Sequence, residues 1–159
     1  MLAQLSPQDG LRMFALKLFA TWDDMDFNGH MRNSAYLDCC SNARLKFFES
    51  HGFTADEFAR HGFGPAIMSD SIRYFRELRL LDEYSVTLRI AGLAPNGSRF
   101  DIENEIIRVD GELCCRVRSV GGWLDFRERK LIVPPRELVD AFEGSARTED
   151  YKELKSSAD

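Results

Sequence analysis

The residue types best suited to acid–base chemistry gather in one short loop. Between Trp22 and Asn33 the chain carries three carboxylates, one histidine and two asparagines. The loop runs into a segment with helical periodicity, and the first N–H groups of a helix are free to bind negative charge. A base beside such an anion site suits acyl transfer to water, because each oxyanion donor is worth about 3–4 kcal/mol. A polar loop whose carboxylates only cap the helix is the alternative interpretation.

The same loop has to be considered as a metal site. Residues 24–29 match the first half of a calcium-binding EF-hand loop. The second half does not fit, because Ala35 stands where a bidentate Glu is needed and Arg32 would bring a cation to the ion. No second His or Cys lies at a ligand spacing from His30, which argues against zinc. We therefore expect neither a metal nor another cofactor.

The elements that must position this loop follow from the spacing of apolar residues. Residues 14–22 alternate as in a strand. The segment after the loop has helical period, and its apolar sector consists of Tyr36, Cys39, Cys40, Ala43 and Phe47. Asn33 or Ser34 is expected to cap this amphipathic helix, and His51-Gly52 to end it. Arg44 falls inside the apolar sector, so it must reach solvent, pair with a carboxylate or face a cleft.

The second half of the chain is predicted to be mainly strands. Candidate strands cover residues 67–78, 84–90, 100–106 and 113–126, and a short helix follows over 136–142. Asp110-Gly111 is the strongest hairpin signal, and Gly121-Gly122 indicates a bulge or a close backbone approach. One long helix packed on about five antiparallel strands is an α+β architecture, and its open edges invite a partner subunit.

Length, charge and cysteine spacing limit the classes of protein. With 159 residues we expect one domain over 13–143, a lead-in over 1–12, and a polar tail or weak helix over 144–159. The formal charge of −5 argues against a nucleic-acid binder. No apolar run approaches the roughly 18 residues of a membrane span, and the start does not resemble a secretory signal. The adjacent pairs Cys39-Cys40 and Cys114-Cys115 indicate free thiols in a reducing cytoplasm.

Together, the loop and the helix make the chain resemble the hotdog-fold acyl thioesterases, in the branch of 4-hydroxybenzoyl-CoA thioesterase. The family pattern is Asp-x-Asp-x-x-Gly-His-x-x-Asn, then an aromatic residue and Ala-Arg. It reads here from Asp24 to Asn33, followed by Tyr36 and Ala43-Arg44. Later segments agree in order, namely Tyr74-Phe75-Arg76, Ser98-Arg99-Phe100, Asp110-Gly111-Glu112, Trp123-Leu124-Asp125 and Pro134-Pro135. The resemblance implies a single hotdog domain.

The resemblance also implies roles for individual residues. The family's catalytic carboxylate falls on Asp26, as nucleophile or general base on the thioester. Plant acyl-carrier-protein thioesterases show a similar Asp-x-Asn-x-His, which falls on Asp26, Asn28 and His30 and in which the Asn and His assist the acid. The backbone N–H near Asn33, at the helix start, would polarise the thioester carbonyl.

Four further residues are candidates for contact with substrate. Tyr36 and Arg44 match positions that line the site in a polyketide-releasing branch. Arg32 is an extra cation where many relatives read Gly-His-Val-Asn-Asn, and Arg99 follows the Asn96-Gly97 turn, so both are weaker candidates for binding a phosphate. Many relatives carry Glu at the position of Asn42, which argues against a Glu-based mechanism from the helix.

The sequence therefore predicts an enzyme that hydrolyses acyl thioesters of coenzyme A or of an acyl carrier protein. By the resemblance it would be a homodimer or homotetramer with sites at the subunit interface, in the cytoplasm, without nucleic-acid or membrane partners. A non-catalytic acyl-binding hotdog protein is the alternative from another class. A hotdog hydratase or dehydratase is less favoured, because the His-Phe-Pro run of those enzymes is absent from the sequence.

Overall fold

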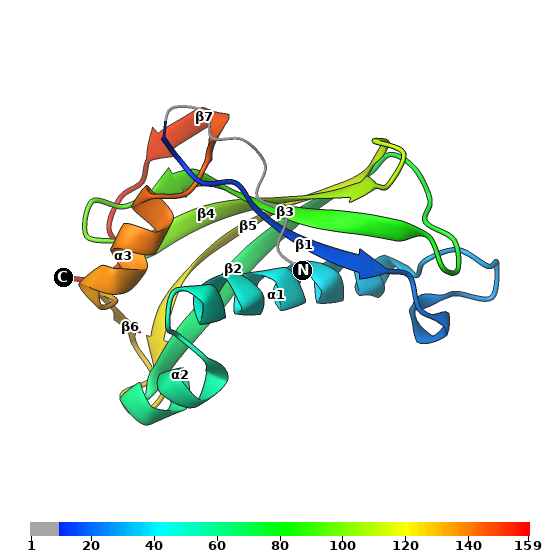
Figure 1. The fold of residues 1–159 in the computed structure, drawn as a ribbon. Helices are drawn as coiled ribbons and strands as arrows, with labels where there is room; N and C mark the ends of the chain where they lie inside the picture. Colours follow the sequence, from blue (N-terminus) through cyan, green and yellow to red (C-terminus); the bar gives the residue numbers. More distant parts are fainter. Residues whose placement is uncertain (1–9) are drawn as a thin grey trace.

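A curved sheet wraps around one long helix in the computed structural model, which describes residues 10–159 (Figure 1). The helices are α1 (Asn33–Ser50), α2 (Ala55–His61) and α3 (Arg136–Glu143), with a short 3-10 turn at Trp22–Asp24. The strands are β1 (Phe14–Phe19), β2 (Phe63–Tyr74), β3 (Glu83–Leu93), β4 (Arg99–Arg108), β5 (Leu113–Asp125), β6 (Leu131–Ile132) and β7 (Arg147–Glu153). Residues 1–9 of the expected lead-in lie outside the described part of the chain.

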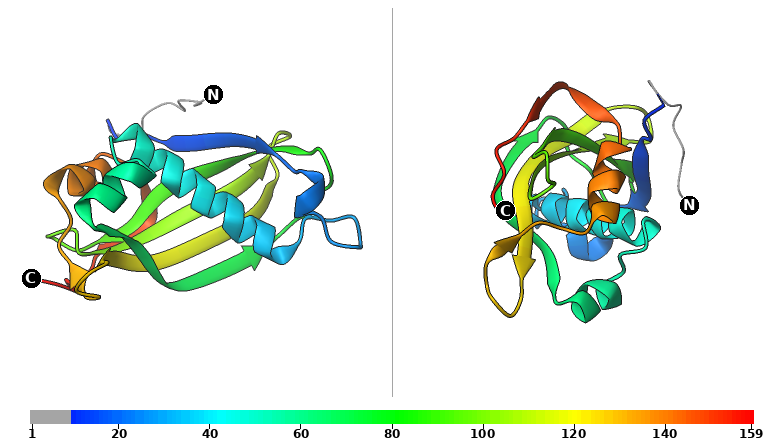
Figure 2. Two further views of the ribbon diagram at one scale, coloured as in Figure 1. Left: turned by 90° about the horizontal axis from the view of Figure 1, so that it is seen from below. Right: turned by 90° about the vertical axis from the view of Figure 1, so that its left-hand side faces the viewer.

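Five strands form a continuous antiparallel path in the order β1-β3-β4-β5-β2, and α1 lies across the concave face of the sheet (Figure 2). Both β1 and β2 therefore end the path, one on each side. Two short strands extend it, since β6 pairs with β5 and β7 runs parallel to β3 beyond the end of β1. The predicted α+β architecture, with one long helix on an antiparallel sheet of about five strands, is confirmed in this form.

The C-terminal segment differs from its expected form. Residues 144–159 were expected to fray or to form a weak helix, but Arg147–Glu153 form β7. The edge of β3 explains the difference, because its backbone groups beyond β1 would otherwise lack partners. The amide of Ile90 donates to the carbonyl of Ala146 at 2.9 Å, and the amide of Leu154 to that of Leu93 at 3.0 Å. Residues 147–153 therefore form a strand because they pair with the edge of β3, although their sequence lacks the apolar alternation that is typical of a strand.

The long helix buries the sector that its periodicity predicts, but its N-cap is one residue earlier than expected. Arg32 is the N-cap, with extended backbone, and no side chain caps the helix. The amide of Arg32 is held by the carbonyl of Asp24 at 2.8 Å, so the helical turn can begin at Asn33. Asn33 and Ser34 are therefore the first residues of α1 rather than its cap. The expected end is confirmed, since His51 is the C-cap and Gly52 has a φ of +87°.

The core consists of two clusters along α1. The cluster beside the first half of the helix contains all four cysteines, which are buried and free, as predicted. The second cluster is aromatic and joins Phe47, Phe48, Phe100, Trp123 and Phe142 from helices and strands. Gly121 allows the close approach that its sequence indicates, because an added Cβ would lie 2.4 Å from the carbonyl oxygen of Ala66. The aromatic cluster closes the end of the molecule that carries α3.

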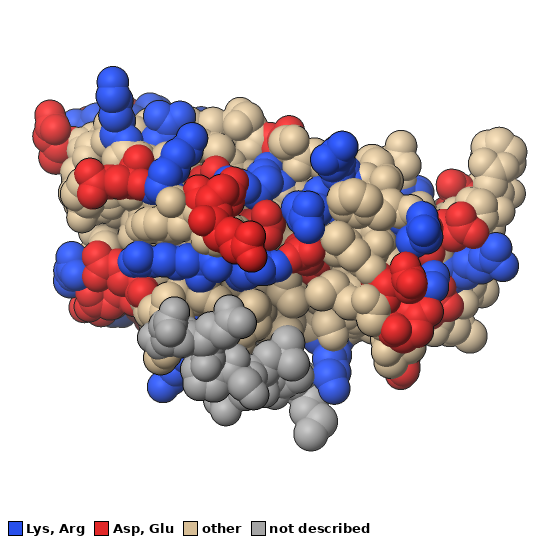
Figure 3. Space-filling model, turned by 90° about the horizontal axis from the view of Figure 1, so that it is seen from above, with Lys and Arg blue, Asp and Glu red and all other residues tan. Residues whose placement is uncertain are grey.

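The convex face of the sheet is covered by paired charges (Figure 3). Arg118 binds both carboxylate oxygens of Asp101, at 3.1 and 2.8 Å, and reaches Asp150 on β7 at 3.0 Å. Arg89 and Arg116 both pair with Glu105. Among the described residues, the Nε atoms of Arg89 and Arg116 have no hydrogen-bond partner, but the charges of this face are paired with one another. The site is therefore sought at the ends of the sheet and on its concave side.

Candidate active site

The carboxylate-rich loop forms a tight hairpin that projects from one end of the sheet (Figure 1). Met25 and Met31 pair across it, and the amide of Asp26 donates to the carbonyl of His30 at 2.8 Å. Phe27 at the tip is 99% exposed. The hairpin is anchored to the connection between β2 and β3, because the amide of Met31 donates to the carbonyl of Leu78 at 2.8 Å. The loop is therefore a fixed structure directly before α1.

Asp26 is oriented by the backbone of its own hairpin. Its Oδ1 accepts hydrogen bonds from the amides of Asn28, at 2.9 Å, and His30, at 3.1 Å. Its Oδ2 has no hydrogen-bond partner among residues 10–159, and the side chain is half-buried. One carboxylate oxygen is thus held in place while the other is free to take a proton from water or to attack a carbonyl carbon.

Asn28 and His30 contact Asp26 through their backbones rather than their side chains. The Nε2 atom of His30 lies 3.8 Å from Oε1 of Glu77, and the side chain of Asn28 is exposed. In the described structure, no hydrogen bond joins the Asp26 carboxylate to the His30 ring. The structure brings the three predicted residues together, but not as a carboxylate–imidazole pair.

The start of α1 carries backbone amides that lack acceptors among residues 10–159. They are the amides of Asn33 and Ser34, and the first turn contains no acidic side chain. The positive end of the helix dipole adds to the attraction for negative charge. The Tyr74 hydroxyl donates to the carbonyl of Asn33 at 3.4 Å, which places the end of β2 beside the helix start. These amides can hold an oxyanion.

Tyr36 is buried beneath this site. Its hydroxyl accepts the amide of Leu78 at 3.3 Å, and its ring lies edge-on to that of Tyr74 with centroids 5.3 Å apart. Burial raises the pKa of Tyr36 to about 12. Tyr36 therefore supports the floor of the site as a neutral phenol, and Tyr74 is a neighbour that single-residue reasoning from the sequence did not assign.

The two weaker arginine candidates have different positions. Arg32 is engaged locally, since its Nε donates to the carbonyl of Asp23 at 3.2 Å and its Nη2 lies 3.5 Å from Asp38. Arg99 is exposed at the first residue of β4, whereas the hairpin lies at the other end of the sheet (Figure 1). Within one protomer the structure does not bring Arg99 to Asp26.

Arg44 is a buried cation on the concave side. Its Nε donates to Oδ1 of Asn104 at 2.9 Å and its Nη2 to the Ser119 hydroxyl, which in turn donates to Asp70. Burial lowers the pKa of Arg44, although a guanidinium stays charged in proteins. A cavity of about 200 Å³ lies beside it, between α1 and β2. Asn104 and Ser119 were not assigned from the sequence, although Asn104 interrupts the apolar face of Phe100, Ile102 and Ile106.

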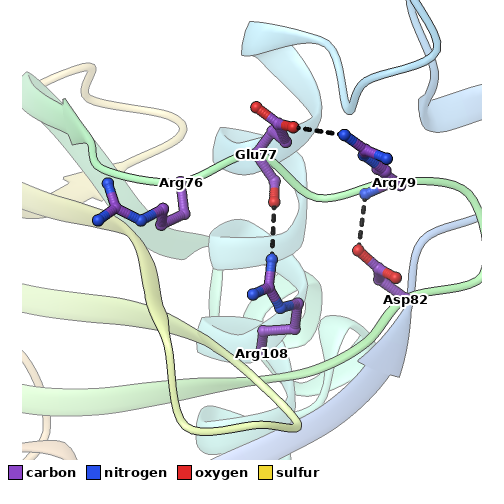
Figure 4. A pocket seen from close by; sticks show the side chains of 5 residues that line it. All are labelled: Arg76, Glu77, Arg79, Asp82 and Arg108. Carbon is purple, nitrogen blue, oxygen red and sulfur yellow. Dashed lines mark hydrogen bonds and ion pairs between the residues drawn. The ribbon is translucent and has the colours of Figure 1, made fainter.

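A second cavity, of about 350 Å³, adjoins the hairpin and is lined by charged side chains (Figure 4). Arg79 pairs with Glu77 at 3.0 Å, and Nη1 of Arg108 donates to the carbonyl of Glu77 at 3.4 Å. The pKa of Glu77 is lowered by Arg79 first and by His30 next. Glu77 also lies close to His30, so a charged group of this cavity interacts with the hairpin that carries Asp26.

Two further features of the described residues bear on function. Within residues 10–159, no group of three or more His, Cys, Asp or Glu side chains is arranged to hold a metal ion. No helix of that part of the chain combines the length and the apolar character needed to cross a membrane.

Known proteins resemble this chain in sequence and in structure. The family model of the thioesterase-like superfamily matches residues 20–142. Two chloroplastic acyl-acyl carrier protein thioesterases of Arabidopsis thaliana are 29% and 28% identical over 112 residues, which is 70% of this chain. The chain spans 58% of the length of these curated relatives.

Solved structures show the same fold. A hypothetical protein from Staphylococcus aureus in complex with CoA superposes with a TM-score of 0.78 at 20% identity, over 90% of this chain and 92% of that protein. A 1,4-dihydroxy-2-naphthoyl-CoA thioesterase from Synechocystis superposes with a TM-score of 0.74 at 21% identity, over 82% of this chain and 95% of that enzyme. At these identities the similarity concerns the fold.

The raised pKa of Tyr36 makes a prediction about alkaline stability. Between pH 10 and pH 12 the unfolded chain releases a proton that the folded chain keeps, so the free energy of unfolding falls as the pH rises. Urea unfolding from pH 9 to pH 11 should show a shallower fall in Tyr36→Phe than in the parent, because the other buried tyrosine and thiols remain in both proteins. Equal slopes would show that Tyr36 is not shielded in the folded state.

Proposed function

The chain belongs to the thioesterase-like superfamily, and from that membership we propose that it hydrolyses acyl thioesters to a free acid and a thiol. The observation that carries the proposal is the arrangement of Asp26, whose free Oδ2 lies in a hairpin leading into the unpartnered amides of α1. A base and an oxyanion site are thus supplied by one continuous segment. The hotdog fold of the solved relatives supports the assignment.

The reaction follows from these two groups. The thioester carbonyl oxygen accepts hydrogen bonds from the amides of Asn33 and Ser34, which stabilise the charge that develops on it by about 3–4 kcal/mol for each donor. Oδ2 of Asp26 removes a proton from a water molecule as the water oxygen attacks the carbonyl carbon. The tetrahedral intermediate then breaks its C–S bond, and the leaving thiolate takes the proton from Asp26. Acid and thiol are released with the enzyme unchanged.

The same oxygen of Asp26 could instead attack the carbonyl carbon and expel the thiolate, giving a mixed anhydride that water then hydrolyses. Turnover in ¹⁸O-labelled water tests for the anhydride. Label incorporated into the Asp26 side chain identifies an anhydride that water opens at the Asp26 carboxyl carbon. Label found only in the product acid fits both the base route and opening of an anhydride at the acyl carbon, and trapping with hydroxylamine distinguishes these two.

Asn28 and His30 act in this proposal as positioning residues. Their amides hold Oδ1 of Asp26, and the His30 ring lies 3.8 Å from Glu77.

The thiol carrier, coenzyme A or an acyl carrier protein, brings phosphate to an acidic enzyme. Arg76, Arg79 and Arg108 line the charged cavity that adjoins the hairpin, so they are basic residues that could face this phosphate.

We also propose that two copies pair along β2. This strand ends the antiparallel path on one side, is twelve residues long and exposes Ile67, Met68 and Tyr74. A long edge strand with exposed apolar side chains readily pairs with another chain. Pairing there would cover the open side of the cavity beside Arg44, so each site would be completed by a partner.

The role of Asp26 predicts a large loss of activity on substitution. Asp26→Ala should lower kcat/KM for acyl-CoA or acyl-carrier-protein thioesters at least about 100-fold, the lower range for a general base. Thiol release over a panel of both carriers measures this. The free energy of unfolding should fall by no more than about 1–2 kcal/mol, for the two lost hydrogen bonds.

Asp23→Ala is the matched control, because Asp23 lies in the same loop and, within residues 10–159, its carboxylate accepts a hydrogen bond from Thr21 alone. It should keep activity close to that of the parent. Full activity in Asp26→Ala would remove Asp26 from the reaction. Thioester binding without thiol release by the parent would favour the acyl-binding alternative.

The pairing of β2 predicts a dimer whose formation depends on this edge. Met68 is 52% exposed on β2, and Met68→Lys would place a charge within the proposed interface. Light scattering after size exclusion should give a mass of twice 18.2 kDa for the parent and a shift toward the monomer for the variant. Val109→Lys, at a 75% exposed position on the β4–β5 hairpin, should leave the mass unchanged. A monomeric parent would contradict the proposal.

A further inference from the structure

One flank of α1 leads from the helix start to the open cavity beside Arg44. Side chains three or four residues apart share one face of a helix. One such row along α1 is Ser34, Leu37, Ser41, Leu45 and Phe48. The cavity at the far end of this row is lined by Ser41, Arg44, Leu45, Phe48, Pro65, Ile67, Phe100 and Ile102. A chain attached to a carbonyl at the helix start can therefore run along this flank into the cavity.

Arg44 brings unused hydrogen-bond donors to a cavity that is otherwise mostly apolar. The residue is only 7% exposed. A guanidinium has five N–H donors, of which the Arg44 side chain donates one to Asn104 and one to Ser119. The other three, both on Nη1 and one on Nη2, have no acceptor among residues 10–159.

The charge of Arg44 is also incompletely matched. Within the described chain no carboxylate lies within ion-pair distance of it, since Asp70 is reached only through the Ser119 hydroxyl. A buried charge without a direct partner is costly, and an apolar residue of similar volume often replaces one at no loss of stability. Stability alone therefore does not account for a guanidinium at this point of the core.

We propose that the cavity binds the distal part of an acyl chain that carries an oxygen acceptor, a hydroxyl or a carboxylate, and that Arg44 binds this oxygen. This inference rests on the proposed function, because it takes the thioester carbonyl to lie at the start of α1. The apolar walls from Leu45, Phe48 and Ile102 take up the methylene groups, and a carboxylate adds charge complementarity with the guanidinium.

The position of Arg44 along the helix gives the distance of the oxygen from the carbonyl. Arg44 lies eleven residues after Asn33, which is about 16 Å along the axis of an α-helix. Helical side chains lean toward the N-terminus, so the guanidinium lies somewhat nearer to the helix start than its Cα atom. The oxygen therefore belongs near the far end of a medium-length chain. The aromatic cluster behind Phe48 and Phe100 closes the cavity to much longer chains.

The test compares thioesters of one length that differ only at the far end. We would measure kcat/KM of the parent protein for dodecanoyl-CoA, 12-hydroxydodecanoyl-CoA and dodecanedioyl-CoA. The oxygenated chains should be preferred at least tenfold, with the carboxylate first. No preference, or a preference for the plain chain, would overturn the inference.

Two substitutions test whether Arg44 causes the preference for oxygenated chains. Arg44→Met removes the charge at similar volume and should abolish the preference, mainly because KM rises more for the oxygenated chains than for the plain chain. Arg44→Lys should keep part of it. Arg60→Met, at an exposed arginine of α2, is the control and should keep the parent's ratios of kcat/KM among the three thioesters.

An equal loss of kcat/KM for all three thioesters in Arg44→Met would show that Arg44 has only a structural role. If Arg44→Met does not fold, the parent's comparison of matched chains decides alone.

A binding measurement separates this inference from the proposed function. Calorimetric titration of the full chain with two CoA thioethers, S-dodecyl-CoA and S-(11-carboxyundecyl)-CoA, requires no hydrolysis, and only the second carries a carboxylate at its far end. Tighter binding of the carboxylated thioether, lost in Arg44→Met, would support the cavity assignment even if no thioester were cleaved. Hydrolysis of all thioesters with equal binding of the two thioethers would leave the proposed function intact and overturn the role of Arg44.

Discussion

Burying α1 within the curve of the sheet leaves only its two ends and one flank accessible. The end that carries α3 is filled by Phe47, Phe48 and Phe142, which pack on Trp123 of β5. The other end presents the amides of Asn33 and Ser34, which have no acceptor in the described part of the chain, and the flank presents the cavity beside Arg44. Because the sheet's convex face is closed by its own ion pairs, chemistry is confined to one end of the helix and its adjoining flank.

The sequence predicts the features that depend on local periodicity. The apolar sector of α1, three of the four long strands after it and the hairpin at Asp110-Gly111 lie where they are expected, because each buries a face that its own spacing defines. The strand β2 begins and ends four residues earlier than expected, at Phe63–Tyr74 rather than at 67–78. The strand β7 was missed, since its polar sequence becomes a strand only by pairing with the exposed edge of β3. The N-cap was displaced to Arg32 for a similar reason, as a contact with Asp24 across the hairpin sets where α1 begins.

The candidate site divides in the same way. The loop with Asp26, Asn28 and His30 is adjacent in sequence to the start of the helix. The proximity of these residues to the helix start could therefore be predicted. The partners that come from distant parts of the chain could not be anticipated. Only the folded chain brings Glu77 beside His30, and Asn104 and Ser119 beside Arg44. One signal for these partners was available in the sequence. A polar residue that interrupts an apolar strand face, as Asn104 does, often forms a hydrogen bond with a buried polar residue elsewhere.

The proposed reaction requires the thioester carbonyl to lie between Asp26 and the first amides of α1. A crystal structure with a non-hydrolysable acyl-CoA analogue, in which a methylene group separates sulfur from the ketone, would locate this carbonyl. We expect the ketone oxygen within hydrogen-bond distance of the Asn33 or Ser34 amide, with Oδ2 of Asp26 facing the carbonyl carbon. A ketone bound elsewhere, for instance beside His30 and Glu77, would contradict it.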